Sequence, residues 1–136
     1  MGNSYPELKT RIQSTFIDLF LMIILMFVVA KVLDSLNPTG ESDDGLIRGV
    51  LFIAIWGVYE PIAMVFGSTL GNYLMKIRVR EHGNTTKRIN ILQSYIRFVI
   101  KILLGWLSFI TISANKERRA IHDLVSGSIM IEKAMN

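Results

Sequence analysis

The chain has 136 residues, of which 51% are hydrophobic, and its mean hydropathy of +0.41 indicates one small membrane domain instead of a soluble globule. The formal charge of +4 does not indicate a nucleic-acid-binding protein, because the basic residues flank apolar stretches and form no face with interleaved aromatic residues. The sequence has no cysteine, which excludes disulfides, thiolate metal sites and a cysteine nucleophile.

The first apolar stretch, residues 12–33, is predicted to be a transmembrane helix. It is slightly longer than the ~20 residues that a spanning helix needs. A cleavable secretory signal peptide is the alternative, with Lys9 and Arg11 as its charged start. The length of the stretch, the presence of Asp18 within it and the apolar stretches that follow favour an uncleaved span.

The second apolar stretch, residues 46–66, is predicted to be a second transmembrane helix, and Glu60 lies within it. A carboxylate at hydrocarbon depth is costly and usually faces the protein interior or a water-filled cavity. Asp18 and Glu60 are therefore candidate functional residues. Pro61 leaves a backbone carbonyl free one turn earlier, which either joins a coordination shell or accompanies an ordinary kink.

Basic residues predict the orientation of these two helices. Lys9 and Arg11 precede the first helix, and residues 67–90 contain five Lys and Arg residues, whereas residues 34–45 contain none. The positive-inside rule then places the N-terminus and residues 67–90 in the cytoplasm. We therefore expect a multi-pass membrane protein whose N-terminus is cytoplasmic.

The third apolar stretch, residues 89–113, carries basic residues beyond both of its ends. A straight crossing would place one basic end outside, against the positive-inside rule. We therefore predict that the stretch lies in the interface or dips in and returns, with Gly105 as the bend, and a third span is the alternative. Arg97 and Lys101 are four residues apart and share one helical face, where they either join a polar cluster or extend to lipid headgroups.

The remaining segments predict a small cytoplasmic ribbon. Residues 76–81 alternate apolar and basic side chains, which is typical of a strand, and residues 128–132 are the second strand candidate. Residues 117–126 are predicted to form a short helix. The predicted fold is an all-α membrane protein, a single domain of residues 1–136, with two transmembrane helices, a third membrane-embedded segment and this β-ribbon.

Three groups of residues together resemble the RDD family of small bacterial membrane proteins over about residues 8–132. They are Arg11-x-x-Ser14-x-x-x-Asp18, Gly67-Ser68-Thr69-Leu70-Gly71 followed by Leu74-Met75-Lys76-Ile77-Arg78-Val79, and Arg119-x-x-His122-Asp123-Leu124-Val125-Ser126-Gly127. The resemblance implies that Arg11, Asp18 and Asp123 are the arginine and two aspartates after which the family is named. It also implies a location in the bacterial cytoplasmic (inner) membrane and transport of an unknown ligand or ion. Asn72 and Lys76 depart from the family pattern, which commonly has lysine and glycine there.

The ionisable residues of the apolar stretches are predicted to form a cluster. Arg11 and Asp18 are seven residues apart on nearly one helical face, roughly 10 Å along the axis, which is too far for a direct pair. Antiparallel packing of the first two helices would place Asp18 and Glu60 at similar depth. Two close carboxylates require a shared proton, a metal cation or basic partners, and Arg97 and Lys101 are the basic candidates.

A surface helix adds two further members. Asp123 follows Arg119 by four residues and is predicted, as an alternative partner, to reach Arg11 at the membrane boundary. The adjacent His122 is interpreted as a helix or interface residue that does not face Asp123. The candidate residues of an ion site or polar network are therefore Arg11, Asp18, Glu60, Arg97, Lys101, Arg119 and Asp123, with Asp18 and Glu60 as candidate cation ligands.

The cluster is compatible with two classes of function. The first is a transport-type or ion-linked membrane protein that acts as a homo-oligomer on a proton or a monovalent cation. The second is a non-transporting accessory or scaffold protein whose charged cluster fixes helix packing. The sequence contains no phosphate-cradling glycine loop, paired zinc histidines or nucleophile elbow, so we expect neither an enzyme nor a cofactor. The expected partners are the lipid bilayer and further copies of the chain, without nucleic acid.

Overall fold

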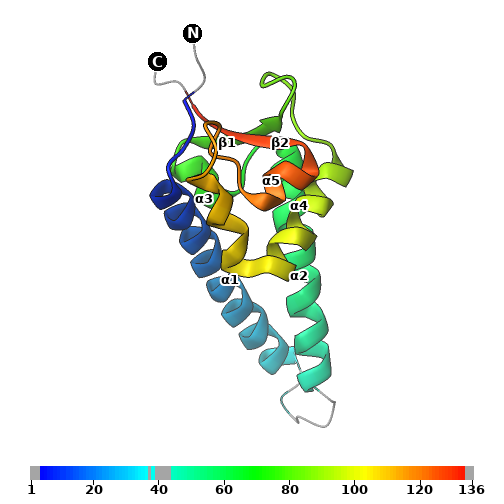
Figure 1. Cartoon of the computed structure of the whole chain (residues 1–136). Helices are drawn as coiled ribbons and strands as arrows, with labels where there is room; N and C mark the ends of the chain where they lie inside the picture. The colour runs from blue at the N-terminus through cyan, green and yellow to red at the C-terminus, as the bar shows by residue number, and fades with distance from the viewer. Residues whose placement is uncertain (1–3, 37, 39–43, 134–136) are drawn as a thin grey trace.

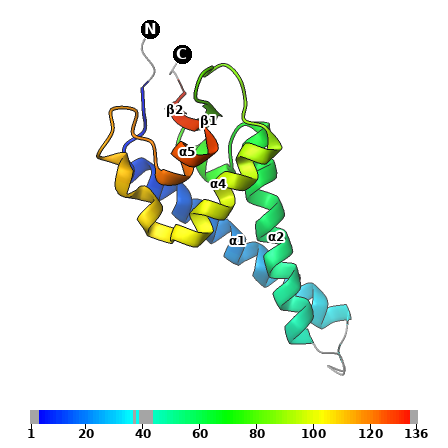
Figure 2. The same cartoon turned by 45° about the vertical axis from the view of Figure 1, so that its right-hand side comes forward.

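A computed structural model describes residues 4–36, 38 and 44–133 of the chain. Two long helices, α1 (Leu8–Leu36) and α2 (Asp44–Phe66), approach each other at one end of the molecule and diverge toward the other, where the remaining elements gather (Figure 1). The first and last described segments of the chain meet at this second end, where the Glu132 N–H donates to the Ser4 carbonyl (Figure 2). The divergence leaves room between α1 and α2 for elements from the C-terminal half.

Within the part of the chain that the structure describes, three helical segments are long and apolar enough to cross a membrane, namely Leu8–Leu36, Gly45–Phe66 and Ile91–Ile112. The predicted helices of residues 12–33 and 46–66 lie within the first two. Helix α1 begins earlier than predicted, and its first turn is closed by a hydrogen bond from the Arg11 N–H to the Glu7 carbonyl. The basic start of this helix is therefore part of the folded domain.

The third apolar segment consists of α4 (Ile91–Leu104) and a 3₁₀ helix, η1 (Gly105–Ile112). A capping box between Asn90 and Gln93 begins α4. Gly105 has a φ of +51°, a conformation that glycine adopts without a Cβ clash, and this is the bend that the sequence predicted. Both views show α4 running away from the sheet and η1 returning toward it (Figures 1 and 2). Both halves pack against α5 (Ile121–Ser126), so the segment folds back at Gly105.

The two predicted strands are present as β1 (Ile77–Glu81) and β2 (Ser128–Glu132). They pair in antiparallel register, with Ile77 opposite Glu132 and Glu81 opposite Ser128. A two-stranded ribbon is marginal alone, but here β1 packs on α3 and β2 packs on α5, and Met64 of α2 joins the buried side chains of both strands. One buried apolar cluster consists of Met64, Ile77, Val79, Ile89 and Met130.

Two short helices differ from the predictions. Helix α5 begins at Ile121 and not at residue 117, because Arg118 has a φ of +48° and Ala120 is extended, which prevents an earlier helical turn. Helix α3 (Leu70–Leu74) lies within residues 67–90, where the sequence predicted only a connection and a strand. A helix of five residues is too short for hydrophobic periodicity to reveal it.

Candidate functional site

The short helix α3 holds the carboxylate of Asp18. The Thr69 hydroxyl donates to Asp18 Oδ2 at 2.6 Å, and the Gly71 N–H donates to Asp18 Oδ1 at 2.8 Å. The Tyr59 hydroxyl, from α2, is a third donor at 3.3 Å from Oδ1. We expected a basic partner for Asp18. Within the described part of the chain its hydrogen-bond donors are instead these neutral groups.

Glycine at position 71 makes this contact between α1 and α3 sterically feasible. A Cβ atom at Gly71 would lie 2.1 Å from the Ser14 backbone oxygen and 2.9 Å from the Asp18 carboxylate. A hydrogen bond also joins α1 to α3 at this contact: the Ser14 hydroxyl donates to Asn72 Oδ1 at 2.6 Å. Asn72, one of the two departures from the family pattern, is thus a buried structural residue here.

Glu60 pairs with Lys101 on α4. Lys101 Nζ lies 2.6 Å from Glu60 Oε1, and both side chains are largely buried. Lys101 thus neutralises one of the two carboxylates, as the sequence analysis allowed. Among the described residues no group of three or more His, Cys, Asp or Glu side chains is placed to hold a metal ion.

A second cluster joins Arg11, Arg97 and Asp123. Arg11 Nη1 donates to Asp123 Oδ2 at 2.5 Å, and Arg97 Nη1 donates to Asp123 Oδ1. The three side chains are 1%, 3% and 0% exposed, so two guanidinium groups share one carboxylate in the interior. The contact of Asp123 with Arg11, which the sequence left open, is therefore present. We expected Arg97 to neutralise Asp18 or Glu60, and this expectation is wrong. Arg97 pairs with Asp123 instead, because α5 packs on α4 and brings Asp123 to Arg97.

Arg119 and His122 complete the surroundings of Asp123. Arg119 donates to the backbone carbonyls of Ser128 and Asp123, at 3.0 and 3.2 Å, and thereby ties α5 to β2. Contrary to expectation, His122 Nε2 lies 3.5 Å from Asp123 Oδ1. Burial, followed by the positive charges of Arg97, Lys101 and Arg11, lowers the pKa of His122 well below its ordinary value. His122 is therefore neutral at pH 7.

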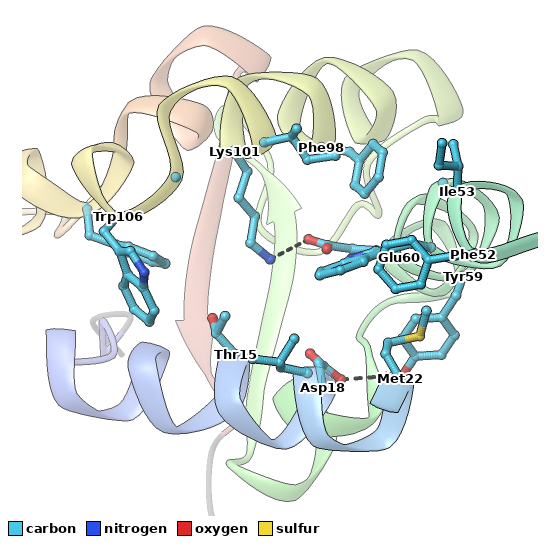
Figure 3. Close-up of a pocket in the computed structure, with 16 residues that line it drawn as sticks. Thr15, Asp18, Met22, Phe52, Ile53, Tyr59, Glu60, Phe98, Lys101 and Trp106 are labelled. Atoms are coloured by element: carbon cyan, nitrogen blue, oxygen red, sulfur yellow. Dashed lines mark hydrogen bonds and ion pairs between the residues drawn. The ribbon is translucent and has the colours of Figure 1, made fainter. Parts of the chain in front are cut away.

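Asp18 and the Glu60–Lys101 pair lie in the wall of one cavity (Figure 3). The cavity has a volume of about 530 Å³ and lies between α1, α2, α4 and η1. In Figure 3, Asp18 and Thr15 extend from α1, Lys101 extends from α4, and Trp106 extends toward α1. Sequence analysis missed the cavity and the donors Thr69 and Tyr59. Thr69 lies within an RDD motif and Tyr59 has no such signal, but the contact of either residue with Asp18 depends on the packing of separate helices.

A comparison with family models places this arrangement in a known family. Residues 5–127 match the model of the RDD family. The chain belongs to the RDD family. Comparisons with curated proteins and with solved structures gave no match. In this RDD protein Arg11 and Asp123 pair directly, whereas Asp18 is held separately at the cavity wall. Lys76 has a φ of +57°, a conformation that glycine adopts more easily than lysine, which agrees with the glycine that the family resemblance implied at this position.

Proposed function

We propose that this RDD protein is an ion-linked membrane transport protein in which Asp18 binds a proton or a monovalent cation. The observation that carries the proposal is the difference between Asp18 and its two neighbouring carboxylates. Glu60 is neutralised by Lys101 and Asp123 by two arginines, whereas the hydrogen-bond donors to Asp18 are neutral. Ion and proton sites in membrane proteins typically contain an ionisable side chain that lies within an apolar helix and faces a cavity.

The cluster of Arg11, Arg97 and Asp123 would have a supporting role. It connects α1, α4 and α5 through charged hydrogen bonds that are almost completely excluded from solvent. Buried ionic groups of this kind can specify one packing arrangement without exchanging an ion. Helices α1 and α4, which both line the cavity, would then keep a constant geometry where they contact α5 while Asp18 changes its charge.

Flux measurements test the proposal directly. The protein is reconstituted into liposomes, and proton movement is followed on addition of sodium, potassium or lithium. Asp18→Asn should abolish cation-dependent flux, while the exposed control Glu117→Gln should leave it unchanged. In detergent, a bound cation should also raise the melting temperature of the wild type by mass action. Melting that is indifferent to pH and to all three cations would rule out the ion site.

A non-transporting accessory protein is the second candidate. The observation that favours it is the extent of apolar surface on α1, where Phe20 and Phe27 are 66% and 65% exposed. Such a surface faces lipid, a further copy of the chain or a membrane partner. A symmetric homo-oligomer whose cavities face a shared path favours transport. A stable complex with a different membrane protein, together with no flux, favours the accessory role.

The proposed location is the bacterial inner membrane with a cytoplasmic N-terminus. Labelling of single cysteines in intact cells tests this orientation. Cysteines at Arg80 and Lys116 should be protected from an impermeant reagent added outside. A cysteine at Ser42 should react, because the connection of residues 34–45 contains no Lys or Arg, whereas residues 67–90 contain five. External labelling at Lys116 would show that residues 89–113 cross the membrane. It would contradict a segment that re-enters the membrane.

A further inference from the structure

The cavity beside Asp18 is larger and more aromatic than a proton or monovalent cation requires. Its volume of about 530 Å³ lies within the roughly 300–1,000 Å³ that is typical of pockets for drug-sized molecules. Its aromatic lining consists of Phe52, Trp56, Tyr59, Phe98, Trp106 and Phe109. Three lining residues also face outward, since Ile53, Ile102 and Trp106 are 72%, 60% and 59% exposed. The cavity therefore opens at the apolar outer surface, from which a membrane-dissolved molecule can enter.

The charge of the cavity wall is negative when Asp18 is ionised. Three charged side chains line the cavity, and two of them, Glu60 and Lys101, neutralise each other at 2.6 Å. The carboxylate of Asp18 is the third, and Tyr59, Glu60 and Lys101 face it. A separate, much smaller cavity is lined by Asp18 together with Arg11, Arg97 and His122. These buried arginines of the second cluster are absent from the lining of the larger cavity and are engaged by Asp123.

A ligand that matches this cavity is apolar and carries a positive charge. Aromatic faces attract a cation through the ring quadrupole, and an ionised carboxylate adds a full negative charge. The apolar wall stabilises the body of the ligand by removing it from water. A neutral apolar molecule would leave Asp18 without a counter-ion, and an anion would be repelled by it.

We propose that the cavity binds a lipophilic organic cation, with the positive charge beside Asp18 and the apolar body among Trp56, Phe98 and Trp106. This inference rests on the proposed function and names the substrate class of the same site. The exchange balances in charge and protons: protonated Asp18 releases one proton as the cation binds, and the cation leaves when the proton returns. Asp18 and its occupant, a proton or the cation, are therefore electrically neutral together in either state.

A titration with two probes of equal shape and opposite charge tests the ligand class. The probes are tetraphenylphosphonium and tetraphenylborate, added to the purified protein in detergent. Both tryptophans of the chain, Trp56 and Trp106, line the cavity, so intrinsic fluorescence reports on its occupation. The phosphonium should bind saturably and at least about tenfold more tightly than the borate. Asp18→Asn should weaken phosphonium binding at least about tenfold and should not weaken borate binding.

A matched pair of glycine variants tests the location without changing any charge. Gly57 lines the cavity, and a Cβ atom there would meet only Phe98 Cε1, at 4.0 Å, so Gly57→Leu places a side chain in the cavity without a backbone clash. Gly49 lies on the same helix, away from the cavity lining, with nothing within 4 Å of a Cβ atom. Gly57→Leu should weaken phosphonium binding at least about tenfold, since it fills the site, and Gly49→Leu should not. This pair decides the question if Asp18→Asn fails to fold.

Several results would overturn the inference. They are equal binding of the two probes, undiminished phosphonium binding in Asp18→Asn, and equal loss of binding in both glycine variants. Absence of phosphonium binding, together with an Asp18-dependent response of melting to sodium or pH, would overturn this inference and leave the proposed function intact. Asp18-dependent phosphonium binding without any flux in liposomes would instead support the ligand class and contradict transport.

Discussion

Substitution of Asp123 tests how the domain tolerates its buried arginines. The carboxylate of Asp123 is 0% exposed and accepts hydrogen bonds from Arg11, Arg97 and the backbone N–H of Ala120. Asp123→Asn keeps the shape and an acceptor for Ala120 but removes the negative charge. The net charge of the three side chains changes from +1 to +2 at a site without access to solvent. Removal of one partner of a buried ion pair costs about 3–5 kcal/mol, which is the expected loss of unfolding free energy.

The assay is equilibrium denaturation of the purified protein in detergent micelles, followed by the loss of helical circular dichroism. Glu117→Gln is the matched control, because Glu117 also lies beside two basic residues but is 42% exposed. Glu117→Gln should lower the unfolding free energy by less than about 1 kcal/mol, as is usual for surface ion pairs. The double variant Asp123→Asn/Arg97→Gln restores the net charge to +1, so it should recover part of the loss, and a double-mutant cycle measures the coupling. A loss for Asp123→Asn no larger than that of the control would refute the reasoning.

Two further predictions concern α3 and His122. Gly71→Ala should lower the unfolding free energy by at least about 1–3 kcal/mol, because its Cβ atom would lie 2.1 Å from the Ser14 oxygen, whereas Gly83→Ala, with nothing within 4 Å, should cost far less. Equal losses would contradict the tight contact. Because the pKa of His122 is lowered in the folded state, the unfolded chain binds more protons as the pH falls below about 6.5. Stability should therefore decrease below that pH by up to about 1.4 kcal/mol per pH unit, and denaturation at pH 7.5 and 5.5 should show a smaller decrease in His122→Gln. The same decrease in wild type and variant would show that His122 is solvated.

The sequence alone determined the elements whose signals are local. The two long helices follow from the length of their apolar stretches, and the bend at Gly105 follows from the charges at both ends of the third stretch. The strands β1 and β2 were predicted from their sequences, and the RDD motifs identified the family before any contact was known. Each of these features depends on residues that are close together in the chain or on their order along it.

Only the tertiary structure decided which charged residues are partners. Spacing indicated that Asp18 needs a partner, but the partner comes from α3, a helix of one or two turns that periodicity cannot reveal. The sequence allowed Arg97 to pair with more than one carboxylate, and the packing of α5 on α4 places Asp123 beside it. The cavity likewise depends on how far α1 and α2 diverge and on where α4 and η1 turn between them. Charges and voids in the interior are set by contacts between distant segments, because a side chain's partner depends on the distance in space and not on the separation along the chain.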